Sequence, residues 1–120
     1  MIKPIHHIIR LQAPDTPIAI CLGKPAWSDM LNFYGFSQEE IDDYLTSNAV
    51  CGFTGSSIIP LYIALPKEYN PILTAHECLH AAIAIWSHAG ANIALPDNDE
   101  VLTYTMDALH RMIKDIYDAN

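Results

Sequence analysis

Hydrophobic and polar positions alternate along the first half of the chain in short extended runs and recur at helical spacing in the second half. Residues 5–11 and 17–22 are short apolar runs separated by turn-forming residues at 13–16, which predicts a β-hairpin. Residues 58–65 form a third apolar run. Because Pro60 within this run has no backbone N–H to donate, we expect an edge strand there.

Capping residues and apolar periodicity predict four helices. Residues 25–34 have a proline in the first turn and a glycine just past the end. A capping box opens a second short helix over residues 37–46, and Asn70 followed by proline opens a longer one over residues 70–88. The last helix spans residues 96–117. The residues that share one of its faces are Leu102, Thr105, Met106, Leu109, Ile113 and Ile116.

These elements predict a single α+β domain over residues 1–120, with a small, mostly antiparallel sheet and an edge strand packed on two long helices. A chain of 120 residues with 51% hydrophobic and 17% charged residues is long and apolar enough to bury its own core.

The charge balance narrows the classes of partner. Fourteen acidic residues against six Lys and Arg give a net charge of −8, which excludes the basic stripe of a nucleic-acid binder and disfavours anionic membrane surfaces. No apolar run approaches the ~18 residues of a membrane span, and the N-terminus lacks the pattern of a signal peptide. Cys21, Cys51 and Cys78 form no CxxC pair, which favours free thiols and a cytoplasmic location.

The segment with the clearest chemistry is His76-Glu77-Cys78-Leu79-His80, an H-E-x-x-H motif inside the predicted helix 70–88. Histidines at i and i+4 lie about 40° apart around a helix axis, so both imidazoles can reach one cation. Glu77 lies about 100° from His76, where a carboxylate can act as general base for a metal-bound water.

The other residues of this helix are apolar on nearly every side, so we expect it to be central and buried. Three ionisable groups in such a helix need partners, and a divalent metal with its water would satisfy all three. The alternative is a pair of core histidines bonded to the backbone, with Glu77 at a solvent edge.

A catalytic zinc site needs a third protein ligand. His88, Asp97, Asp99 and Glu100 are the candidates, and Glu100 follows His80 by 20 positions at the start of the next helix. Two antiparallel helices joined by a short loop would bring Glu100 to face the histidines. Alternatively, Asp97 and Glu100 form a capping box for the last helix.

The motif followed by Glu100 resembles the gluzincin pattern of thermolysin-like zinc peptidases, and residues 70–109 also resemble very small HExxH proteins encoded by bacteriophages. The resemblance implies a minimal zincin-like core, with His76, His80 and Glu100 as zinc ligands and Glu77 as the catalytic base. Two features differ from that family: the chain has no room for a second lobe, and Tyr104 occupies the position of a supporting Asp.

Two further side chains, Tyr104 and Asp107, have two interpretations each. Tyr104 either stabilises an oxyanion or packs in the core. Asp107 either orients a liganding histidine through a hydrogen bond or is exposed to solvent. His88 is expected to be a solvated residue at a helix end.

The sequence therefore predicts a zinc-dependent hydrolase, most simply a peptidase, whose substrate carries a basic patch and whose missing wall comes from a partner protein or a homodimer. If the chain is phage-encoded, its location is the host cytoplasm. The alternative is a non-catalytic binding or regulatory protein that is stabilised by its metal. A fourth protein ligand such as His88, Asp97 or Asp107 would favour that alternative.

Overall fold

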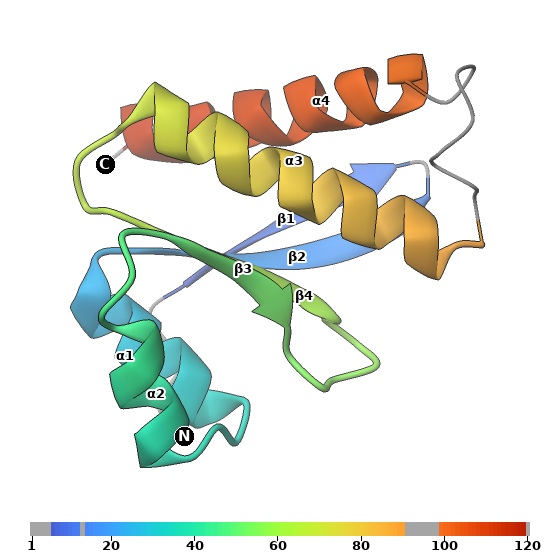
Figure 1. Ribbon diagram of the computed structural model, residues 1–120. Helices are drawn as coiled ribbons and strands as arrows, with labels where there is room; N and C mark the ends of the chain where they lie inside the picture. The colour runs from blue at the N-terminus through green and yellow to red at the C-terminus, as the bar shows by residue number, and fades with distance from the viewer. Residues whose placement is uncertain (1–5, 13, 91–98, 120) are drawn as a thin grey trace.

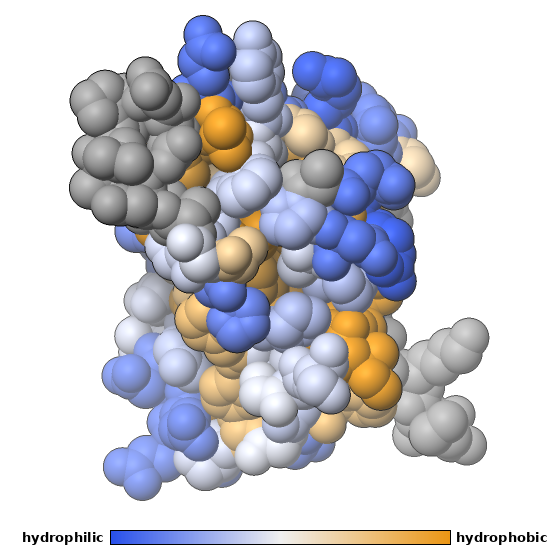
Figure 2. Space-filling view, turned by 90° about the vertical axis from the view of Figure 1, so that its right-hand side faces the viewer, coloured by the Kyte–Doolittle hydropathy of each residue, from blue (hydrophilic) through white to orange (hydrophobic). Residues whose placement is uncertain are grey.

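The computed structural model describes residues 6–12, 14–90 and 99–119. It confirms the predicted α+β class, with a four-stranded mixed sheet between two layers of helices (Figure 1). Within these residues, no helix has both the length and the hydropathy needed to cross a membrane. Figure 2, which views the molecule from the side where the helix bearing the HExxH motif ends, shows hydrophobic residues in separate groups among hydrophilic ones.

The strands lie in the order β1 (His7–Gln12), β2 (Asp15–Leu22), β4 (Leu61–Leu65) and β3 (Val50–Phe53). The predicted hairpin is confirmed, because β1 and β2 pair in antiparallel register across their short turn. The pairing of β2 with β4 is parallel and that of β4 with β3 is antiparallel. The sheet is therefore mixed, with two antiparallel pairs and one parallel pair.

The expectation of an edge strand over residues 58–65 is wrong. β4 pairs with a neighbour on each side, and all five of its residues are buried. Pro60 lies just before the strand, so its missing N–H removes no bond from the ladder, and its carbonyl accepts the N–H of Thr54 at 2.9 Å. β3 is the edge strand of the sheet beside the helix that carries the HExxH motif. The sequence pattern did not predict this strand.

Alternation along the two central strands supplies a core on each face of the sheet. On one face, the buried strand residues are Ile9, Leu11, Ile18, Ile20, Leu61, Ile63 and Leu65. On the other face they are Ala19, Cys21, Tyr62 and Ala64. The first set packs under α3 (Pro71–His88) and α4 (Asp99–Asp118), and the second under α1 (Lys24–Phe33) and α2 (Gln38–Tyr44).

The capping signals of the short helices are confirmed. α1 has a proline in its first turn, and Gly35 follows its end with φ of 86°. At the start of α2, the hydroxyl of Ser37 accepts the Glu40 N–H at 3.2 Å, and the Glu40 carboxylate accepts the Ser37 N–H at 3.0 Å. This is the reciprocal capping box that the sequence predicts.

α3 begins where the sequence predicts, since the side-chain oxygen of Asn70 accepts the N–H groups of Ile72 and Leu73 at 3.0 and 3.1 Å. The expectation that it is buried on every side is wrong, because Ile72 is 80% exposed and Leu79 41% exposed. One face of α3 packs on the sheet and one flank on α4, and in the part of the chain that the structure describes nothing covers the rest (Figure 1).

α4 runs antiparallel to α3. The indole N–H of Trp86, near the end of α3, donates to the Thr105 hydroxyl at 2.8 Å, whereas Tyr69, just before α3, lies 2.7 Å from the His110 ring nitrogen. The predicted apolar face is confirmed, with Thr105, Leu109 and Ile113 buried. The predicted start at residues 96–98, including Asp97 of the capping box, lies outside the described residues.

Gly52 in β3 should not tolerate a side chain. A Cβ at this position would lie 2.9 Å from the hydroxyl oxygen of Tyr62, whose ring is buried. We expect Gly52→Ala to lower the free energy of unfolding by about 1–3 kcal/mol, because the tyrosine must shift in a packed core. Urea unfolding followed by circular dichroism measures this. Ser57→Ala in the exposed β3–β4 loop is the control, and equal stability of the two variants would contradict the prediction.

Candidate metal centre

The two histidines of the motif converge on the exposed side of α3. Their Nε2 atoms lie 3.0 Å apart and their ring centroids 4.6 Å apart, with the rings nearly perpendicular. Two nitrogens bound to one tetrahedral zinc at the usual bond length lie about 3.3 Å apart. The separation also suits a hydrogen bond between one protonated and one unprotonated nitrogen. The pair therefore needs little movement to bind a cation.

Glu77 has the opposite environment. It is 6% exposed, and its Oε2 atom lies 3.8 Å from Nε2 of His76. Within the described residues the carboxylate accepts no hydrogen bond. The alternative of two core histidines with Glu77 at a solvent edge is therefore wrong, since the imidazoles are accessible and the carboxylate is enclosed. The carboxylate therefore lies beside the imidazole pair, in the position that a general base needs.

A cavity of about 590 Å³ opens beside these three residues. Its walls come from the end of α2, from β3 and from α3, which contributes His76, Glu77 and His80. Among the described strands, β3 pairs with β4 alone, so its other edge has free backbone groups. The motif thus borders a hollow that also contains an unpaired strand edge.

Two thiols lie close enough to Glu77 for its charge to act on them. Burial raises the pKa of Cys51, on β3, to about 12, and the charge of Glu77 adds to this effect. Burial likewise raises the pKa of Cys78 to about 12, with smaller contributions from Cys51 and Glu77. Both remain protonated near neutral pH, so neither is an activated nucleophile. All three cysteines of the chain are free.

The structure does not bring the predicted third ligand to the histidines. Glu100 is exposed in the first turn of α4, which the antiparallel packing places toward the C-terminal end of α3. Over residues 6–12, 14–90 and 99–119, no three His, Cys, Asp or Glu side chains form a group able to hold a metal. Ligation by Glu100 stays a prediction, and the eight residues that precede Asp99 lie outside the described part of the chain.

Tyr104, Asp107 and His88 do not line this cavity. Tyr104 is 68% exposed on α4, so it is not the core residue of its alternative interpretation, and it does not line the cavity. Asp107 is exposed and, among the described residues, forms no hydrogen bond with either imidazole. His88 lies at the end of α3 with its ring centroid 6.4 Å from that of Phe53. The roles proposed for Tyr104 and Asp107 stay predictions.

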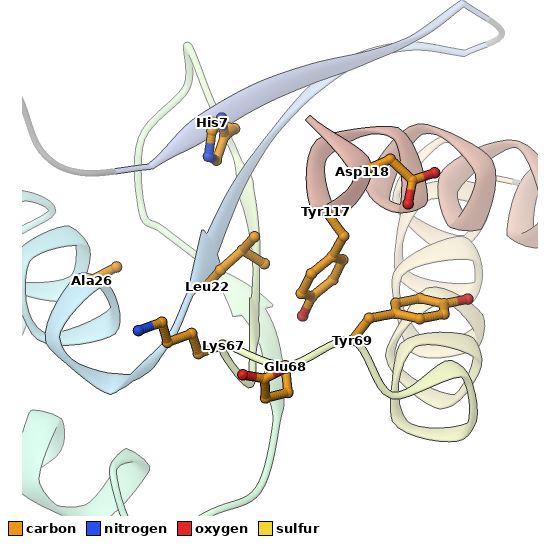
Figure 3. A pocket seen from close by; sticks show the side chains of 8 residues that line it. All are labelled: His7, Leu22, Ala26, Lys67, Glu68, Tyr69, Tyr117 and Asp118. Atoms are coloured by element: carbon orange, nitrogen blue, oxygen red, sulfur yellow. The ribbon is translucent and has the colours of Figure 1, made fainter. Parts of the chain in front are cut away.

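A second cavity, of about 500 Å³, lies at the carboxyl ends of β2 and β4 (Figure 3). The Tyr117 hydroxyl beside it donates to the Pro66 carbonyl at 2.6 Å, and Tyr69 bonds to His110. Its charged residues, such as Lys67 and Asp118, are exposed rather than held toward its interior. These polar groups serve the structure, so the motif on α3 is the stronger candidate site.

Sequence reasoning missed the wall opposite the motif. Asp43 at the end of α2 and Cys51 on β3 line the cavity, although neither belongs to a recognisable motif. The signal for β3 was the short run at residues 50–53 between Asn48 and Gly55, which resembles a strand bounded by turn residues. No family model, curated protein or solved structure matches this chain.

Proposed function

We propose that this protein is a zinc-dependent hydrolase that acts on peptides. One observation carries the proposal: two imidazoles converge to 3.0 Å next to an enclosed carboxylate at the edge of a cavity. In this proposal His76 and His80 are ligands, Glu77 is the general base, and Glu100 joins the histidines when the metal binds. α3 lies across the sheet beside the free edge of β3, and this arrangement supports the inference of a minimal zincin-like core (Figure 1).

Zinc, when bound, supplies a Lewis acid and lowers the pKa of a water molecule to about 7. The proton transfers are carried out by residues of the chain. Glu77 takes the proton from the attacking water and delivers it to the leaving amine, so one carboxylate acts first as base and then as acid. Cys51 and Cys78 stay protonated near neutral pH, so neither thiol competes with the attacking water as a nucleophile.

β3 offers the binding edge for an extended substrate. Its outer backbone groups border the same cavity as the histidines, so a peptide that adds to this edge passes close to Nε2 of His76 and His80. β4 cannot take this role, because it pairs with a neighbouring strand on each side. The free thiols support the cytoplasmic location that the sequence predicts.

Metal analysis tests the proposal. We expect elemental mass spectrometry of the purified protein to find about one zinc per chain, and the double variant His76→Ala/His80→Ala to retain none. Thr46→Ala, which changes an exposed residue on the α2–β3 connection, is a matched surface control. A wild-type protein without bound zinc after incubation with the metal would refute the proposal. Bound zinc without hydrolysis of any peptide would favour the non-catalytic alternative.

Zinc should also raise the melting temperature. A ligand at about 100 times its dissociation constant stabilises the folded state by about 2.7 kcal/mol, provided that the unfolded chain binds it poorly. We expect differential scanning calorimetry to show a rise of several degrees with zinc and its loss with a chelator. Because both imidazoles are accessible, the metal-free protein should remain folded. Identical melting curves for the wild type and His80→Ala in the presence of zinc would contradict a site on α3.

A further inference from the structure

The cavity beside the motif continues along β3 into a smaller one of about 190 Å³. The two share Phe53, Leu61 and Ala84 in their walls, so they form one groove that follows the free edge of the sheet. We call this the β3 groove. One of its ends is at Asp43 and the other at the β3–β4 loop near Ile58. The histidines and Glu77 lie between the two ends.

The end at α2 is acidic. The carboxylate of Asp43 is exposed and, among the described residues, has no ion pair or side-chain hydrogen bond. Glu77, more than nine-tenths buried and without a hydrogen-bond donor, faces the same hollow. No Lys or Arg of the described segments lines either part of the groove. Two carboxylates in a concave surface that has no Lys or Arg side chain beside them create a negative electrostatic potential, which attracts cationic groups.

The opposite end is largely apolar. Phe53 is 57% exposed and Ile58 79% exposed, and two prolines extend this surface. Asp15 also lines this end, but its charge is paired with Arg10 at 2.8 Å. Burying these exposed hydrophobic side chains under an apolar side chain of a ligand is favourable, because it removes apolar surface from water. The two ends therefore favour different kinds of side chain on one bound segment.

We propose that the β3 groove selects extended peptide segments that carry a Lys or Arg side chain for Asp43 and a large apolar side chain for the Phe53–Ile58 end. The four residues of β3 span about 10 Å, a length that a peptide paired along this edge covers in three or four residues. We therefore place the two selected side chains at that spacing. Asp43 is then a specificity-determining residue. The claim that such a segment is also cut rests on the proposed zinc hydrolase.

Binding to the Glu77→Gln variant tests selection without hydrolysis. Three fluorescein-labelled hexapeptides would share one leucine and differ at a position four residues away, which holds Lys, Gln or Glu. We expect fluorescence anisotropy to give about three- to fivefold tighter binding for the Lys peptide than for the Gln peptide, and weaker binding still for the Glu peptide, as suits an exposed ion pair. Raising the salt concentration should reduce the difference.

Two matched pairs locate the effect. Adding Asp43→Asn should abolish the preference for Lys, whereas Asp42→Asn, one residue away and bonded to Gln38, should preserve it. Phe53→Ser should weaken binding of all three peptides, whereas Ile72→Ser on the exposed side of α3 should not. Equal binding of the Lys and Glu peptides, equal effects of the two Asp variants, or no binding at millimolar peptide would overturn the inference. Selective binding to wild-type protein without zinc-dependent cleavage would refute the proposed function alone.

Discussion

Replacing Glu77 by Gln is expected to lower zinc-dependent peptide hydrolysis by about 10²–10⁴-fold while leaving zinc bound. The amide keeps the shape of the side chain but cannot accept the proton of the attacking water. It also removes a buried carboxylate that has no hydrogen-bond donor among the described residues, so the free energy of unfolding should stay equal or rise. Hydrolysis of a quenched fluorescent peptide and elemental analysis of the same sample measure both effects.

The matched variant is His80→Ala, which should lose zinc and hydrolysis together. If Glu77→Gln released zinc as completely as His80→Ala does, Glu77 would be a ligand and its assignment as the base would be wrong. If Glu77→Gln hydrolysed the peptide at the wild-type rate, the enclosed carboxylate would have no part in catalysis. Glu100→Gln completes the series, since the proposal expects it to weaken zinc binding.

Replacing Trp27 by Ala is expected to lower the free energy of unfolding by about 3–5 kcal/mol, the range for deleting a buried aromatic ring. Trp27 is fully buried between α1 and the sheet, and its indole N–H donates to the Leu65 carbonyl at 2.8 Å. The variant therefore loses packing and leaves a buried carbonyl without a donor. This is a large share of the roughly 5–15 kcal/mol that stabilises a domain, and urea unfolding followed by circular dichroism measures it.

Two controls separate these contributions. Trp27→Phe keeps most of the ring but removes the N–H, so it should cost less than Trp27→Ala. Phe33→Ala at the exposed end of the same helix should change stability by less than about 1 kcal/mol. A stability for Trp27→Ala within 1 kcal/mol of the wild type would mean that α1 contributes little to the core on that face of the sheet.

Local sequence signals predicted the elements that depend on neighbouring residues. The Ser37 capping box, the start of α3 at Asn70 and the β1–β2 hairpin are confirmed, because each depends on hydrogen bonds or turns within a few positions of the chain. The spacing of His76 and His80 is of the same kind, since a helix places i and i+4 on one side. The convergence of the imidazoles could therefore be read from the sequence.

Strand order and burial depend on contacts that a local pattern does not contain. Pro60 suggested an edge strand, but the proline lies outside the ladder and β4 became the interior strand between β2 and β3. The apolar residues around α3 suggested burial on all sides, but one layer of sheet and one neighbouring helix cover only part of a helix surface. Each outcome follows from which elements pack together, and not from the residues of the element itself.

The sequence by itself determined the α+β class, the helix that carries the motif and the pairing of two imidazoles with one carboxylate. Tertiary structure alone decided that Glu77 is enclosed while His76 is exposed, and that Asp43 from α2 shares their cavity. The physical reason is that helical spacing fixes angles around one axis, whereas burial depends on where α2, β3 and α4 lie around that axis. Those positions come from the two cores on either side of the sheet.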